Sequence, residues 1–194
     1  MDNKSIVKTL KLFAQLLELH EENPFKIKNF TNANFKLSKY AEPLFSKSLE
    51  DLAKIEGVGK SAASKIVEFI ETGVIEELEA LKQITPAGII DMLQIKGIGP
   101  KKIRIIWTEL NIDTIGELYY ACNENRLVEA KGFGYKTQED VKKQIEFFWS
   151  NTGKNLYANA LFIANEFEAY LKKEIKDITI ECTGEMRRKC EIIH

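Results

Sequence analysis

The chain has 194 residues, of which 44% are apolar and 29% are charged, and its formal net charge is −1. This length is enough for two or three compact units. No run of residues approaches the roughly 20 apolar positions that span a bilayer, so we expect a cytoplasmic protein without membrane contact. Because basic residues do not exceed acidic ones, any surface for nucleic acid must be local.

The three cysteines exclude two further classes of protein. Cys122, Cys182 and Cys190 are odd in number and show no C-x-x-C spacing. A disulfide framework and a zinc site are therefore not expected.

The first unit is predicted to be helical throughout. An apolar stripe at helical spacing predicts a first helix that ends before Asn23 and Pro24, and a second amphipathic stretch covers residues 25–36. After a capping-box pattern at residues 48–51, one helix should precede Gly57 and another should follow Gly59, ending at Gly73. The unit closes near residue 84.

A second unit is predicted to open at Thr85 and Pro86, where Thr can cap a helix and Pro suits its first position. Residues 95–100 (IKGIGP) then echo residues 55–60 (IEGVGK) at a separation of 40 residues. Only these short cores match, which favours two related motifs over a repeat array. A third G-x-G at residues 132–134 is a candidate degenerate hairpin.

The carboxyl-terminal part shows a change of pattern. A long helical stretch runs from Leu156 to about Glu174, and apolar residues at 178, 180 and 182 then alternate with polar ones as in a strand. Such a small sheet is not stable alone, so we expect the natural protein to continue. The predicted domains are residues 1–84, 85–153 and 154–194.

The hairpins carry the main functional signal. Glycine can adopt a positive φ and has no side chain, so a phosphate can reach the backbone N–H groups at the start of the following helix. Contacts of this kind grip the sugar-phosphate backbone without reading sequence. One hairpin alone could be an ordinary turn, but two matched copies favour DNA binding. The candidate DNA-binding residues are Gly57, Val58, Gly59, Lys60, Gly97, Ile98, Gly99, Lys101, Lys102 and Arg104.

These residues resemble the amino-terminal part of family X DNA polymerases, the polymerase β-like repair enzymes, particularly the bacterial kind. Residues 55–73 are similar to the hairpin of the family's 8-kDa domain, which holds the downstream side of a DNA gap. Residues 95–102 resemble the hairpin that holds the primer strand, and residues 132–137 match another stretch of that subdomain. The resemblance covers essentially the whole chain.

The resemblance implies a mainly α fold, with two helix-hairpin-helix domains followed by the start of an α/β nucleotidyltransferase palm. It also implies a role in base excision repair, with gapped or nicked DNA carrying a 5′-phosphate as partner, near the bacterial nucleoid and as a monomer. The aspartates for two Mg²⁺ ions would fall beyond His194, so we expect no polymerase activity and no cofactor in this chain. Carbonyl groups of the hairpins are candidate ligands for a monovalent cation.

A second activity of some relatives removes 5′-deoxyribose phosphate through a lysine Schiff base. Lys65 aligns with that nucleophile and Lys26 with a ligand of the 5′-phosphate, whereas Phe30 replaces a tyrosine of the strongly active relatives. Helical spacing alone predicts that Lys65 is a solvent-facing contact for a phosphate. Both roles for Lys65, lyase nucleophile and phosphate contact, therefore remain open.

The palm of the family begins with a Gly-Ser pair and an Arg that contact the phosphates of the nucleotide. Gly184, Arg187 and Arg188 match this pattern, but Glu185 replaces the Ser and would repel a triphosphate. This departure supports an alternative, a non-catalytic helix-hairpin-helix module. A third hypothesis is that the helices bind protein.

Overall fold

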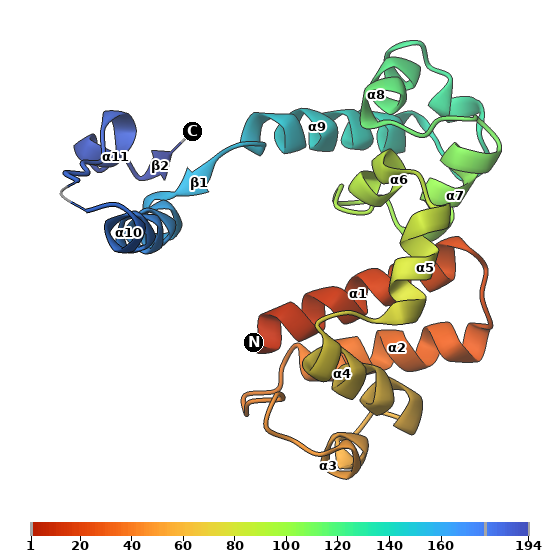
Figure 1. Cartoon of the computed structure of the whole chain (residues 1–194). Helices are drawn as coiled ribbons and strands as arrows, with labels where there is room; N and C mark the ends of the chain where they lie inside the picture. Colours follow the sequence, from red (N-terminus) through yellow and green to blue (C-terminus); the bar gives the residue numbers. More distant parts are fainter. Residues whose placement is uncertain (1, 177, 194) are drawn as a thin grey trace. The chain divides into compact units, whose positions relative to one another are not determined.

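The computed structural model describes residues 2–176 and 178–193. The chain divides into two compact units, Met1–Ile145 and Glu146–His194, which are considered separately (Figure 1). Among the described residues, no helix has the length and apolar character needed to cross a membrane.

The described residues of Met1–Ile145, which span the predicted unit 1–84 and most of the predicted unit 85–153, form helices and connecting loops without strands, as predicted. The elements of this unit, in chain order, are α1 (Asn3–Leu19), α2 (Pro24–Leu37), α3 (Leu49–Lys54), α4 (Lys60–Thr72), α5 (Glu76–Ile84), α6 (Ala87–Met92), α7 (Pro100–Thr108), α8 (Ile115–Asn123), the 3-10 turn η1 (Leu127–Glu129) and α9 (Tyr135–Asn151), which runs past the end of the unit.

Helix α1 is the centre of this unit. It packs against α2, α4, α5 and α7, and α2 lies beside it in Figure 1. The Phe13 ring meets the Phe30 ring edge-on, with the centroids 4.8 Å apart, and both side chains are fully buried. Burial of two aromatic rings in this geometry stabilises the α1–α2 pair beyond the area that they remove from water.

Local sequence signals set the ends of several helices. The Asp2 side chain caps α1, Asn23 caps α2, and Thr114 forms a complete capping box with Glu117 at α8. Gly73 ends α4 with a φ of 79°. Each of these residues supplies either a side-chain acceptor for free N–H groups or a left-handed backbone, and the predicted end of α4 at Gly73 is confirmed.

The prediction for Thr85 was wrong. Thr85 is the C-cap of α5, and Pro86, not Thr85, is the N-cap of α6. The Thr85 hydroxyl donates to the Leu81 carbonyl at 2.7 Å, so it accepts from His20 Nε2, also at 2.7 Å. The Thr85 hydroxyl is thus engaged by α5 and His20, and α6 begins without a side-chain cap.

In the described part of the second unit, the end of α9 is followed by α10 (Tyr157–Glu174) and α11 (Gly184–Arg188). Strand β1 (Asn155–Leu156) pairs antiparallel with β2 (Ile192–Ile193), with Asn155 opposite Ile193. The strand expected through residues 178, 180 and 182 is absent, since the described residues there form no regular structure. Alternating side chains make a strand only where a partner accepts its backbone hydrogen bonds.

Candidate nucleic-acid interface

Three turns of one geometry occur in the first unit. In each, a backbone N–H donates to the carbonyl three residues earlier: Val58 to Ile55 (2.9 Å), Ile98 to Ile95 (3.5 Å) and Phe133 to Ala130 (3.1 Å). The third residue of each turn is a glycine with a positive φ, as a type II turn requires: 85° at Gly57, 93° at Gly97 and 87° at Gly132. The degenerate third motif is therefore a genuine hairpin of the same build.

The apolar residue between the two glycines of each hairpin anchors the turn. Val58 is 3% exposed, Ile98 4% and Phe133 7%. The middle side chain points into the core, and the flanking backbone stays at the surface. This arrangement explains the alternation of glycine and apolar residue in the sequence.

The second glycine of the first two hairpins begins a helix without a side-chain cap. Gly59 is the N-cap of α4 and Gly99 the N-cap of α7, and neither has a side chain that could accept a hydrogen bond from the first N–H groups. Those groups and the positive end of the helix dipole attract an anion.

The space around these glycines differs between hairpins. A Cβ at Gly59 would lie 2.9 Å from Asn29 Oδ1, so a side chain there would require the Asn29 amide to move. A Cβ at Gly99 or Gly134 would meet no atom within 4 Å, and neither residue has a positive φ. The fold itself therefore does not require glycine at these two positions, which is consistent with close approach of an external partner.

Charge also differs between the hairpins. The second residue of the turn is Glu56 in the first hairpin, where Lys36 Nζ lies 2.6 Å from its carboxylate, but Lys96 in the second and Lys131 in the third. Lys101 follows the second hairpin with its side chain 85% exposed. The second and third hairpins are thus the more basic pair.

The second and third hairpins are also neighbours. Lys102 Nζ lies 5.3 Å from the centroid of the Phe133 ring. A cavity of about 230 Å³ separates Lys96 and Gly97 from Thr137 and Asp140. Two glycine turns, each followed by a helix start, are therefore presented together.

Lys26, the expected ligand of a 5′-phosphate, and Lys65, the candidate nucleophile or phosphate contact, come together in the first helix-hairpin-helix domain. Both contact Glu77, and Lys65 Nζ also donates to Glu68 at 2.8 Å. The hydrogen bond from Lys65 and a second from the Glu76 backbone N–H lower the pKa of Glu68. Phe30, which replaces the tyrosine of active relatives, is fully buried and cannot touch a ligand.

Arg104 and Lys60 occupy different environments. The Arg104 guanidinium donates to the Leu19 carbonyl at 2.9 Å and lies 2.8 Å from Glu21, so it ties α7 to the end of α1. Lys60 is exposed at the first position of α4. Of these two, Lys60 is the better placed for a phosphate next to the hairpin.

The residues expected to contact a nucleotide lie in the second unit. Gly184 begins α11 with a φ of 60°, and Arg187 and Arg188 are exposed in its last turn. Glu185 lies in the first turn of the same helix. A carboxylate thus shares this short helix with both arginines.

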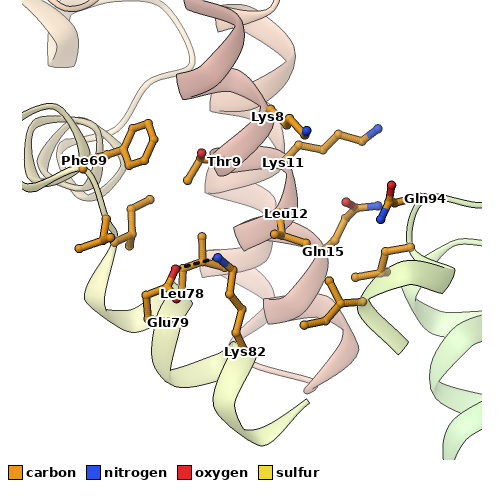
Figure 2. A pocket seen from close by; sticks show the side chains of 15 residues that line it. Lys8, Thr9, Lys11, Leu12, Gln15, Phe69, Leu78, Glu79, Lys82 and Gln94 are labelled. Carbon is orange, nitrogen blue, oxygen red and sulfur yellow. Dashed lines mark hydrogen bonds and ion pairs between the residues drawn. The ribbon is translucent and has the colours of Figure 1, made fainter. Parts of the chain in front are cut away.

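A larger cavity of about 590 Å³ lies elsewhere in the first unit (Figure 2). Its apolar wall includes Leu12 and Leu78, and Lys8 and Lys11 also line it. No hairpin residue lines this cavity, so it is not part of the interface. Among the residues that the structure describes, no group of three or more His, Cys, Asp or Glu is arranged to hold a metal ion.

Comparison with known families agrees with this geometry. A helix-hairpin-helix domain family matches residues 1–75, and a SAM-like helix-hairpin-helix tandem matches residues 89–146, which include both basic hairpins. Two helix-hairpin-helix domains therefore make up most of this chain. The predicted mainly α fold with two such domains is confirmed.

The whole chain is also similar to a curated protein. It is 30% identical, over 193 residues and 100% of its length, to the DNA polymerase/3'-5' exonuclease PolX of Bacillus subtilis (strain 168). The resemblance to the amino-terminal part of a family X DNA polymerase is thereby confirmed. The chain spans 34% of the length of that relative.

Two features of the interface could not be recognised from sequence. Glu68 follows Lys65 by three residues on one helix, a spacing that signals an ion pair, but Glu77 lies on another helix and reaches Lys26 only through the fold. The pairing of the second and third hairpins likewise depends on the packing of Phe133.

Proposed function

We propose that this chain binds gapped DNA, as the DNA-binding part of a family X repair polymerase. The first hairpin would hold the strand downstream of the gap, and the second would hold the primer strand. The observation that carries this proposal is the shared geometry of the hairpins, with a positive-φ glycine, a buried apolar anchor and an uncapped helix start at Gly59 and Gly99. This arrangement suits a phosphate backbone and no particular base.

The charge distribution supports local contact with DNA. The net charge of the chain is −1, so attraction must be local, and exposed lysines stand at all three hairpins: Lys60 at the first, Lys96 and Lys101 at the second, and Lys131 at the third. Each lysine that neutralises a phosphate releases a counterion and makes binding weaker in salt.

The decisive experiment is a titration of fluorescent DNA followed by anisotropy, at several NaCl concentrations. The two DNAs have the same sequence, one with a one-nucleotide gap and the other uninterrupted. We expect tighter binding to the gapped DNA and a steep decrease of affinity with salt. Equal affinity for the two DNAs would contradict the proposal.

Glu185 favours a second candidate, a non-catalytic DNA-binding module. A carboxylate in the first turn of α11 opposes binding of a triphosphate beside Arg187 and Arg188. Primer extension by the full-length protein with Mg²⁺ and deoxynucleotides distinguishes the two. Extension supports the polymerase, and its absence together with retained gap binding supports the module.

A further inference from the structure

Lys26, the expected ligand of a 5′-phosphate, and Lys65 share one carboxylate. Lys26 Nζ donates to Glu77 Oε1, and Lys65 Nζ lies 3.9 Å from Glu77 Oε2. The three side chains are 24–36% exposed, so the cluster is half-buried at the surface. Glu77 therefore bridges two ammonium groups that come from α2 and α4, while Glu77 itself lies on α5.

This bridge has the chemistry of a bound phosphate. A carboxylate offers two anionic oxygens to two cationic donors, as a phosphate monoester would between the same lysines. Lys65 is also paired with Glu68, so two lysines and two glutamates sum to zero formal charge. A DNA phosphate that entered this cluster would meet no excess of positive charge unless Glu77 left.

We infer that Glu77 competes with the 5′-phosphate of DNA for Lys26 and Lys65, and so sets how strongly the chain prefers a phosphorylated end. In the free protein Glu77 occupies the phosphate position. In the complex, Glu77 turns away and the phosphate takes its place. This inference rests on the proposed binding of gapped DNA, because it concerns one site within that interface.

A purely structural ion pair would behave differently. Lys26 also lies 6.0 Å from the centroid of the Phe13 ring, so the pair could serve only to hold α5 against α1 and α2. Loss of such a pair would change the melting temperature and would alter affinity for every DNA end by the same factor. Competition instead changes the ratio of the dissociation constants for DNA with a 5′-phosphate and DNA with a 5′-hydroxyl.

The test uses the Glu77→Gln variant and gapped DNA with either a 5′-phosphate or a 5′-hydroxyl at the downstream side. Gln has the size of Glu but no charge, so the lysines are released for the phosphate. The measured quantity is the ratio of the two dissociation constants, determined by anisotropy at fixed salt. We expect the preference for the phosphate to rise by about 1.4- to fivefold in the variant, which corresponds to the roughly 0.2–1 kcal/mol of a solvent-accessible charge pair.

Glu79→Gln is the matched control. Glu79 lies on the same helix, and its replacement by Gln changes the net charge by the same amount. Glu79 pairs with Lys82 instead, at 2.7 Å, and Figure 2 draws this ion pair. The control should leave the phosphate preference unchanged. Lys26→Met in the Glu77→Gln background should then remove the gain.

The outcomes separate this inference from the proposed function. An equal change of affinity for both ends in Glu77→Gln overturns the inference, even if gapped DNA is still preferred over intact duplex. If the wild-type chain does not prefer gapped DNA, the proposed function fails, while the ratio measured on the two ends still tests Glu77. A gain of the same size in Glu79→Gln shows a general charge effect and also overturns the inference.

Discussion

The substitution Gly99→Ala separates binding from folding more cleanly than any other change in the hairpins. Gly99 has a φ of −90° and a ψ of 169°, which any residue adopts, and a Cβ there meets no atom of the chain within 4 Å. The substitution leaves the folded state unstrained and removes freedom from the unfolded chain, a gain of about 0.4–1 kcal/mol that the poorer N-cap preference of Ala offsets, so stability should change by less than about 1 kcal/mol. The new methyl group projects where a phosphate would approach.

The expected loss of binding can be estimated from the contacts at stake. A hydrogen bond to a charged group contributes about 1.5–3 kcal/mol, so exclusion of one phosphate should weaken binding of gapped DNA at least about tenfold. Anisotropy titrations measure the affinity, and thermal melting followed by circular dichroism measures stability. Wild-type affinity in Gly99→Ala would refute the assignment of this hairpin to DNA.

Two companion variants complete the experiment. Gly97 has a φ of 93°, so Gly97→Ala should cost about 1–2 kcal/mol and lower the melting temperature by about 2–8 °C. Gly116 lies within α8 and away from any hairpin, and Gly116→Ala should stabilise the helix without changing affinity. The interface therefore predicts three different results: Gly97→Ala loses stability, Gly99→Ala loses affinity for DNA, and Gly116→Ala keeps the affinity of the wild type.

Three further predictions concern charge. Lys101→Ala should weaken binding to all DNA sequences alike and reduce the slope of log K against log salt by about one, because its side chain is 85% exposed beside the second hairpin. Burial and the nearby Arg104 lower the pKa of His20 below 6.5, so the unfolded chain binds the proton more tightly. The free energy of unfolding, from urea titrations, should therefore fall as pH drops through 6.5, and His20→Gln should remove this part of the dependence. Finally, borohydride trapping on an incised abasic site tests Lys65 as a nucleophile: its amine is paired with Glu68, so we expect weak trapping, and trapping equal to that of Lys65→Ala excludes the lyase.

Local sequence signals predicted the helices of the first unit well. Apolar spacing predicted α1 with its buried stripe, and Gly73 predicted the end of α4. The prediction failed at Thr85, where a local cap pattern lost to a hydrogen bond from His20, a residue of another helix. The expected strand near residue 180 failed for a similar reason, since pairing depends on a partner that local sequence does not specify.

The sequence by itself determined the hairpins, because a turn with a positive φ and a buried anchor needs only glycine and an apolar residue in the right order. Tertiary structure decided which hairpins lie together and which charges remain available. Phe133 brings the third hairpin beside Lys102, and Glu77 reaches across from α5 to Lys26 and Lys65. Sequence spacing determines which residues meet within one helix or turn. Residues far apart in the sequence, such as Glu77 and Lys26, come into contact only through the packing of the helices.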